Sequence, residues 1–167
     1  MKEPGSPRRT VYVETTIISY MTSRPSRDII VLARQELTRQ WWEMERTRYR
    51  ICISSQVVEE ARIGDPSAAR KRLALLAGLE SLTPTPRIDE VSRSIRSALK
   101  IPTKSVGDAI HVAFAVCYEL DYLLTWNCAH LANADNLRLL TDFCRREGLW
   151  LPVVCTPEEM IGERREA

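Results

Sequence analysis

The chain has 167 residues, of which 44% are hydrophobic, and its 24 Lys and Arg nearly balance its 22 Asp and Glu. This length fits one ordinary domain with a real core, and the near balance of charge excludes a global positive field, so any nucleic-acid binding must use a local patch. The five cysteines are widely spaced and form no C-x-x-C pair, which excludes a disulfide framework and a zinc site and predicts reduced, mostly buried thiols.

The two ends of the chain are expected to lie outside the folded domain. Residues 1–9, MKEPGSPRR, are polar and lack the apolar segment of a secretory signal, so we expect a disordered tail there. A single domain over 10–156 and a C-terminal tail over 157–167 complete the chain. The most apolar long stretch, 105–124, is not expected to span a membrane, because it contains Asp108, His111, Glu119 and Asp121. We therefore expect a cytoplasmic protein.

Short β-rich runs alternate with longer helical patterns along the chain. Strands are expected at residues 10–13, 50–54, 78–82, 121–125 and 151–155. Helices are expected at residues 27–48, 55–63, 66–77, 89–99, 104–118 and 134–147. This alternation predicts an α/β fold in which helices cover both faces of a parallel sheet.

The helix expected at 27–48 carries apolar residues at helical spacing, which predicts a buried face made of Ile29, Ala33, Leu37, Trp41 and Met44. Trp41 and Trp42 are adjacent, so their side chains point in directions about 100° apart. One of them is expected in the core, and the other is expected to be exposed enough to join a partner surface.

Polar residues stand where two of the strands are expected to end. Glu14 and Thr15 follow the first strand, and Thr125 and Asn127 end the fourth. Ligand sites in open parallel sheets lie beyond the carboxyl ends of the strands. The neighbouring helices contribute the further acidic candidates Glu59, Glu60 and Asp108.

Carboxylates that share one pocket raise one another's pKa unless a cation neutralises them. Mg²⁺ and Mn²⁺ prefer oxygen ligands and accept carboxylates that the fold gathers from distant parts of a sequence. Such sites support displacement at phosphorus. The sequence contains no G-x-G-x-x-G or G-x-x-x-x-G-K-[ST] loop, which removes most of the support for a nucleotide cofactor.

Four segments taken in order, VYVETTIISY, ISSQVVEEARIG, VGDAIHVAFAV and DYLLTWN, resemble the PIN domain, in particular the VapC-type toxins of toxin-antitoxin pairs. The resemblance covers roughly residues 10–156, and GDAIHVA followed by LLTWN is its most specific part. It implies a three-layer α/β/α sandwich with a central parallel sheet. It also implies a Mg²⁺- or Mn²⁺-dependent endoribonuclease that leaves a 5′-phosphate and a 3′-hydroxyl, a homodimer, and a cognate antitoxin that covers the acidic site or inserts a segment into it. Single-stranded or looped RNA is the expected substrate.

Carried over residue by residue, the resemblance assigns the catalytic roles to Glu14, Glu60, Asp108 and Asn127, the first three of which would hold the metal. Glu60 is preferred to Glu59 because it stands four residues before Gly64. The family's first acid is usually Asp, so Glu14 is one methylene longer. A fourth acid is often found at the position of Asn127. Asn127 is uncharged, which disfavours a second metal ion, but its amide oxygen could bind the metal or a metal-bound water.

Several of these residues have a second interpretation. Ser105 to Asp108 matches the S-x-x-D capping pattern, which would explain Asp108 by helix capping. On a helical projection, His111 and Asp108 lie off the expected buried face, and His111 is interpreted as a structural hydrogen-bonding residue. Thr15 and Thr125 either bind metal waters or phosphate, or they serve turns.

Three basic residues are candidates to hold phosphates of the substrate: Arg24, Arg27 and Lys104. The main alternative to a nuclease is a PIN-like module that has lost activity and binds RNA or a protein partner. The features that motivate it are the longer side chain of Glu14 and the uncharged Asn127.

Overall fold

The computed structural model describes residues 7–102 and 105–162. Within these residues one five-stranded sheet has the order β3-β2-β1-β4-β5. The strands are β1 (Thr10–Val13), β2 (Arg50–Ser54), β3 (Glu80–Leu82), β4 (Tyr122–Leu124) and β5 (Val153–Cys155). All neighbouring pairs are parallel, so the predicted parallel sheet is confirmed.

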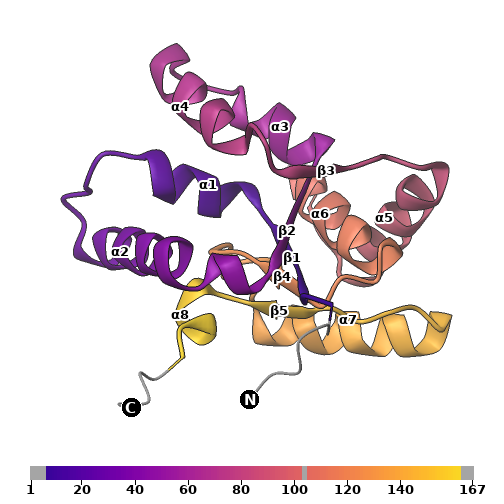
Figure 1. Cartoon of the computed structure of the whole chain (residues 1–167). Helices are drawn as coiled ribbons and strands as arrows, with labels where there is room; N and C mark the ends of the chain where they lie inside the picture. The colour runs from indigo at the N-terminus through magenta and orange to yellow at the C-terminus, as the bar shows by residue number, and fades with distance from the viewer. Residues whose placement is uncertain (1–6, 103–104, 163–167) are drawn as a thin grey trace.

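Helices make the crossovers that parallel strands need. In chain order they are α1 (Thr15–Thr22), α2 (Ile29–Met44), the 3₁₀ helix η1 (Arg46–Arg48), α3 (Ser55–Ala61), α4 (Pro66–Leu76), α5 (Pro86–Ala98), α6 (Val106–Cys117), α7 (Ala134–Glu147) and α8 (Pro157–Met160). Helices α1 and α2 lie on one side of the sheet, and α5, α6 and α7 lie on the other (Figure 1). The chain is therefore the three-layer α/β/α sandwich that the sequence predicted.

Strand β1 is the middle of the sheet, and the order of the strands reverses beside it. The chain runs outward from β1 to β2 and β3, and then crosses back to β4 and β5 on the other side. The crevice between the carboxyl ends of β1 and β4 is thus a switch point, where sheets of this kind bind ligands. The backbone N–H of Glu14 donates to the carbonyl of Leu124 at 3.1 Å, which holds these two strand ends together.

Helix α1 is not among the predicted helices, because the β-branched residues after Glu14 do not favour a helix. Thr15, Thr16, Ile17 and Ile18 each disfavour a helix by about 0.5 kcal/mol relative to Ala. Ile17 and Ile18 are fully buried, and burying one such side chain stabilises the fold by about 1.5–3 kcal/mol. Burial therefore outweighs propensity, and the helix begins directly after Glu14.

The apolar face predicted for α2 is wrong in part. Ile29 is 79% exposed and Met44 is 46% exposed, whereas the buried residues of the helix are Gln35, Thr38, Trp41 and Trp42. Both tryptophans are buried, contrary to the expectation that one would be exposed, because the Trp41 ring packs between Trp42 and Tyr49 at centroid distances of 6.2 and 6.3 Å.

Helix α6 is buried on more than the one face that the projection predicted. Its buried residues are Ala109, His111, Val112, Ala113, Phe114, Ala115 and Val116. The helix contacts α5, α3 and β4, and a helix that is apolar nearly all round belongs in the core. His111 is therefore an interior residue, and its expected position off the buried face is wrong.

Ordered structure extends a little beyond the expected domain at both ends. The carbonyl of Arg9 accepts a hydrogen bond from the Arg50 N–H at 2.9 Å. Helix α8, in the segment expected to be a tail, packs against α2 and buries Met160. Residues 1–6 and 163–167 of the two expected tails lie outside the described residues.

All five cysteines are free, and Cys52, Cys144 and Cys155 are buried. Among the helices of the described residues, none combines the length and the apolar character needed to cross a membrane.

Candidate metal centre

Glu14 is a buried residue at the end of the central strand, and only 4% of it is exposed. Its Oε2 accepts hydrogen bonds from Thr16 Oγ1 at 2.5 Å and from Thr125 Oγ1 at 2.8 Å. Thr125 directly follows β4 and Thr16 is in α1, which follows β1, so one hydroxyl comes from each side of the switch point. These hydrogen bonds hold the Glu14 carboxylate in a fixed orientation at the carboxyl end of the sheet. Glu14 is therefore not a solvated loop residue.

Glu60 reaches the same place from α3. Its Oε1 accepts from Gln56 Nε2 at 2.7 Å, and its Oε2 accepts from Thr15 Oγ1. The neighbouring Glu59 is exposed and pairs with Arg62 at 3.2 Å. Of the two adjacent acids, Glu60 is the one whose carboxylate lies beside His111.

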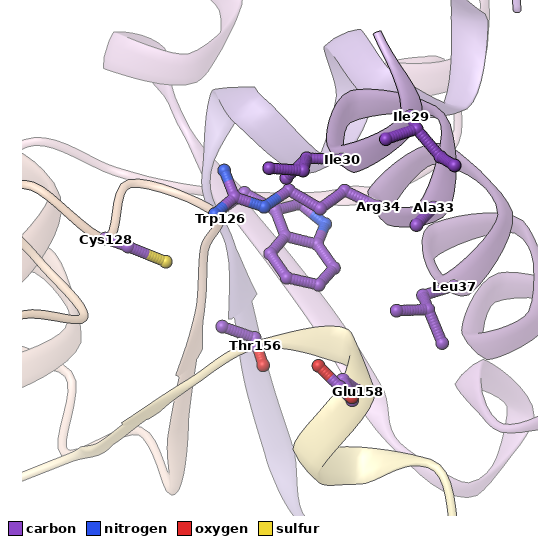
Figure 2. A pocket seen from close by; sticks show the side chains of 9 residues that line it. All are labelled: Ile29, Ile30, Ala33, Arg34, Leu37, Trp126, Cys128, Thr156 and Glu158. Carbon is purple, nitrogen blue, oxygen red and sulfur yellow. The ribbon is translucent and has the colours of Figure 1, made fainter.

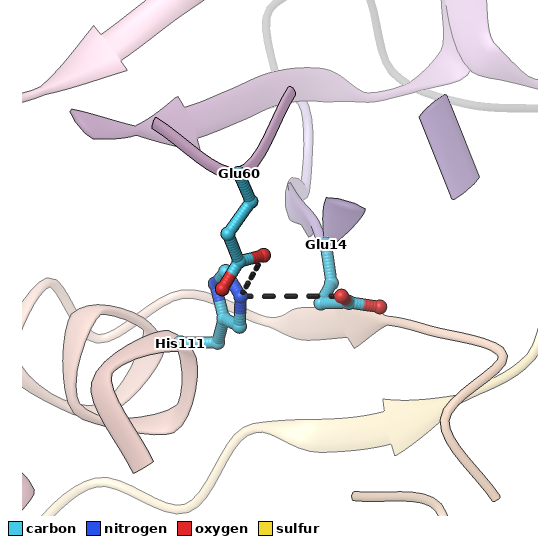
Figure 3. Close-up of side chains that lie close together, drawn as sticks. All are labelled: Glu14, Glu60 and His111. Carbon is cyan, nitrogen blue, oxygen red and sulfur yellow. Dashed lines mark hydrogen bonds and ion pairs between the residues drawn. The ribbon is translucent and has the colours of Figure 1, made fainter. Parts of the chain in front are cut away.

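His111 lies between the two carboxylates. Its Nε2 is 3.1 Å from Glu60 Oε2 and 3.9 Å from Glu14 Oε1, and its side chain is 1% exposed (Figure 3). One ligand atom from each of Glu14, Glu60 and His111 lies within 4.8 Å of the other two. On its other side, His111 Nδ1 is 2.8 Å from the Tyr12 hydroxyl, which lies 2.6 Å from Ser54 Oγ.

Asp108 lies beside this cluster and is not one of its members. Its Oδ1 accepts from Asn127 Nδ2 at 2.9 Å, while Asn127 Oδ1 accepts from the backbone N–H of His130 at 3.1 Å. Asn127 therefore turns a donor toward the acids, and its amide oxygen is occupied elsewhere. Ser105 makes no side-chain cap, so capping does not explain Asp108.

The electrostatics of the cluster follow from burial and from its hydrogen bonds. Burial raises the pKa of Glu60, but the hydrogen bond and charge of His111, with the hydrogen bonds from Thr15 and Gln56, outweigh it and lower the pKa to about 2. Burial lowers the pKa of His111, but Glu60 and Glu14 outweigh it and raise the pKa above its ordinary value. Burial and the charge of Glu14 raise the pKa of Asp108, against the opposing charge of His130.

Gly107 makes room for Glu60 at the first turn of α6. A Cβ at this position would lie 2.5 Å from Glu60 Oε1 and 3.1 Å from Gln56 Nε2. The backbone of α6 thus forms one wall of the position that Glu60 occupies, and a side chain at residue 107 would require the Glu60 carboxylate to move.

The residues fit a divalent cation. Glu14 Oε1 lies 3.9 Å from His111 Nε2, which is too far for a direct hydrogen bond. Carboxylates that lie close together repel each other, and a cation bound between them removes that repulsion. Glu14, Glu60 and His111 supply two oxygens and one nitrogen, a donor set that divalent metals accept.

The remaining predicted site residues fall into three groups. Thr15 and Thr125 are at the site, where they donate to the carboxylates. Arg24 and Arg27 are exposed beyond the far end of α1, a helix whose eight residues span about 12 Å. Lys104 lies outside the described residues.

Sequence reasoning missed other members of the site. Tyr12 and Ser54 were read only as strand residues, and the strand pattern gave no sign of their hydroxyls. Gln56 stands four residues before Glu60, a spacing that places both on one helix face and could have been recognised. Thr16 directly follows Thr15, but the helix that orients it was not predicted.

An all-parallel sandwich with buried acids at its switch point has the form of a PIN-like fold, and comparisons with solved structures agree. A chain of VapBC2 from Rickettsia felis, solved bound to a DNA fragment from their promoter, matches with a TM-score of 0.57 and 14% identity, covering 88% of this chain and 98% of that one. A chain of VapBC-1 from nontypeable Haemophilus influenzae matches with a TM-score of 0.56 and 14% identity, covering 89% and 98%. No family model matches the sequence, and no curated protein matches it. The predicted resemblance to VapC-type PIN domains is thus confirmed at the level of the fold.

Proposed function

We propose that this chain is a Mg²⁺- or Mn²⁺-dependent endoribonuclease that cleaves single-stranded or looped RNA, and that it is the toxin of a toxin-antitoxin pair. The observation that carries the proposal is the pair of carboxylates Glu14 and Glu60, which converge with His111 at the switch point of the sheet. The PIN-like fold shared with the VapBC complexes supports the same conclusion.

In this proposal Glu14 and Glu60 hold the cation, and the hydroxyls of Thr15, Thr16 and Thr125 keep the two carboxylates oriented. The cation would lower the pKa of an attacking water and stabilise negative charge at phosphorus. These hydroxyls are uncharged, so they do not cancel the negative charge of the carboxylates, which still attracts a divalent ion.

Asp108 is suited to accept the proton of the attacking water. Asn127 fixes its Oδ1, and among the described residues its Oδ2 has no hydrogen-bond partner. A pKa raised above the ordinary value makes a carboxylate a better proton acceptor. We therefore assign Asp108 the role of base and Asn127 that of positioning Asp108.

Cleavage of a mixed structured RNA by the purified protein, in Mg²⁺, Mn²⁺ or EDTA, tests this proposal. Asp108→Asn is expected to lower the rate by about 100-fold or more, the scale of a lost general base. Glu59→Gln is the matched control, because Glu59 neighbours Glu60 on α3 but is exposed, and it is expected to cleave at the wild-type rate. Cleavage that persists in EDTA, or full activity of Asp108→Asn, would contradict the proposal. If the wild type binds metal and RNA without cleaving, the chain is the inactive PIN-like module instead.

An antitoxin needs a docking surface, and an apolar groove is a candidate for it. The groove has a volume of about 520 Å³ and lies between α2, the segment after β4, and α8 (Figure 2). Its walls are Ile29, Ile30, Ala33, Arg34, Leu37, Trp126, Cys128, Thr156 and Glu158. One wall of the groove is connected to the residues that orient Glu14, because the backbone N–H of Trp126 donates to Thr16 Oγ1 at 2.8 Å.

We propose that an amphipathic segment of the antitoxin occupies this groove. Ile29 and Ile30 are 79% and 63% exposed, and they would bury apolar surface against it. Co-expression with the product of a neighbouring short open reading frame tests this. Ile29→Glu with Ile30→Glu is expected to abolish co-purification, while Ile63→Glu, at an equally exposed isoleucine outside the groove, is expected to retain it. Co-purification of the double variant would place the antitoxin elsewhere.

We also propose that the chain forms a homodimer and acts in the cytoplasm, as the sequence implied. Sedimentation equilibrium of the purified chain measures its oligomeric state directly, and a monomer at micromolar concentration would remove the dimer from the proposal.

A further inference from the structure

His111 brings a nitrogen atom into a site that otherwise offers only oxygens. Its Nε2 lies 3.1 Å from Glu60 Oε2 and 3.9 Å from Glu14 Oε1. Two ligands of an octahedral ion with bonds of about 2.1 Å lie about 3.0 Å apart when adjacent and about 4.2 Å apart when opposite. Both distances from Nε2 fall within this range, and the three ligand atoms lie within 4.8 Å of one another, so side-chain movement can bring all three onto one cation.

The hydrogen bonds on the far side of the ring allow Nε2 to present a lone pair. Nδ1 lies 2.8 Å from the Tyr12 hydroxyl, and this hydroxyl lies 2.6 Å from Ser54 Oγ. If Nδ1–H donates to Tyr12 and Tyr12 donates to Ser54, the Nδ1–H and the Tyr12 hydroxyl each have an acceptor, and Nε2 carries no proton. Histidines that bind metals usually donate their other N–H to an oxygen in this way.

The same series of groups can also run in reverse. Ser54 then donates to Tyr12, Tyr12 donates to Nδ1, and Nε2–H donates to Glu60. Tyr12 and Ser54 are both fully buried, so neither direction depends on water. The ring can therefore serve as a donor to Glu60 or as a ligand without moving from its position.

We propose that His111 Nε2 is a direct ligand of the cation, together with Glu14 and Glu60, and that the site therefore prefers transition metals to Mg²⁺. The inference rests on the proposed function for the presence of a metal. An imidazole ligand strengthens binding along the series from Mn²⁺ through Co²⁺ to Ni²⁺, whereas Mg²⁺ selects oxygen ligands. Tyr12 is a positioning residue, because it fixes the ring through Nδ1.

Pulsed electron paramagnetic resonance of Mn²⁺ added to the metal-free, full-length protein tests the ligand directly. We expect coupling of Mn²⁺ to a ¹⁴N nucleus in the wild type, and its loss in His111→Gln. The affinity for Mn²⁺ and Co²⁺ is expected to fall about 10-fold or more in this variant, while the affinity for Mg²⁺ changes less. Glu59→Gln serves as the matched control and is expected to keep both the coupling and the affinity.

Tyr12→Phe provides a second test that retains the buried ring and the histidine. It is expected to keep the ¹⁴N coupling but to bind Mn²⁺ about 10-fold to 100-fold more weakly, because the Nδ1–H loses its acceptor. Circular dichroism of both variants checks that they fold.

The possible failures separate the two proposals. If the wild type binds Mn²⁺ but shows no ¹⁴N coupling, His111 is not a ligand, and the nuclease proposal remains intact. No Mn²⁺ binding, or binding that is unchanged in Glu14→Gln, overturns both.

Discussion

The two carboxylates of the metal centre are oriented mainly by neutral donors. Glu14 accepts from two threonine hydroxyls, and Glu60 accepts from a threonine hydroxyl and from the amide of Gln56. Neutral donors fix the oxygens without cancelling their charge, which a lysine or arginine would do. Glu14 is one methylene longer than the Asp that is usual in the family. This extra length lets its carboxylate reach Thr16 and Thr125 from the end of β1.

Adding a methyl group at residue 107 is expected to push the Glu60 carboxylate away from the metal centre. In Gly107→Ala the new Cβ would lie 2.5 Å from Glu60 Oε1, so the carboxylate must move aside. A displacement of about 1 Å in catalytic geometry can cost about 100-fold in rate. RNA cleavage by Gly107→Ala should fall on this scale, with Gly162→Ala, which has no neighbour within 4 Å, as the control. An unchanged rate in Gly107→Ala would mean that Glu60 does not need this position.

The charges around His111 predict how the stability of the metal-free protein depends on pH. Glu60, Glu14 and Asp108 face the ring and raise its pKa above the ordinary 6.5, against burial. The stabilisation from the protonated ring is complete below pH 6.5 and is lost as the pH rises through the folded-state pKa. Glu60 has its pKa lowered from 4.5 to about 2, so its contribution is present above 4.5 and is lost toward pH 2.

Urea denaturation in EDTA should therefore give the highest free energy of unfolding between about pH 4.5 and 6.5. His111→Gln is expected to lose the decline on the alkaline side, because the titrating ring is gone. A decline of the same size in wild type and variant would assign it to other groups.

At the scale of elements, the strands and most helices could be predicted, because their patterns are local. The helix at Ala134–Glu147 agrees with its predicted range, since Asn133 caps its start and Gly148 adopts a left-handed conformation with φ of 62° at its end. Helix α1 could not be predicted, because its residues favour strands and only the packing of Ile17 and Ile18 stabilises it. The projection of α6 failed because it assumed a single buried face.

The packing of α1 has a measurable consequence. Ile17→Ala is expected to lower the free energy of unfolding by about 2–5 kcal/mol, since the fully buried side chain leaves a cavity. Ile63→Ala, at a site that is 71% exposed, should change it by about 0.5 kcal/mol or less. Urea denaturation of both variants gives the comparison. If both variants lower the free energy of unfolding by the same small amount, α1 does not depend on the burial of Ile17.

At the scale of the whole molecule, the site is a product of topology. Glu14, Glu60 and Asp108 come from elements far apart in the chain, and motif order alone indicated that they would meet. What the sequence could not show was the third member of the cluster, because the position of His111 depends on α6 being enclosed by α5, α3 and the sheet. The direction of the Asn127 amide likewise depends on the backbone of His130.

A cation in this centre would connect the end of β1 to helices α3 and α6. Glu14 follows β1, Glu60 is on α3, and His111 is on α6, so three separate parts of the fold share one ion. The unfolded chain cannot form this arrangement, so binding stabilises the folded state by about 2.7 kcal/mol when free Mn²⁺ is 100 times its dissociation constant. Thermal unfolding with increasing Mn²⁺ should show a rising midpoint in the wild type and in Glu59→Gln, and none in Glu14→Gln. A midpoint that rises equally in Glu14→Gln would mean that Mn²⁺ acts elsewhere on the molecule.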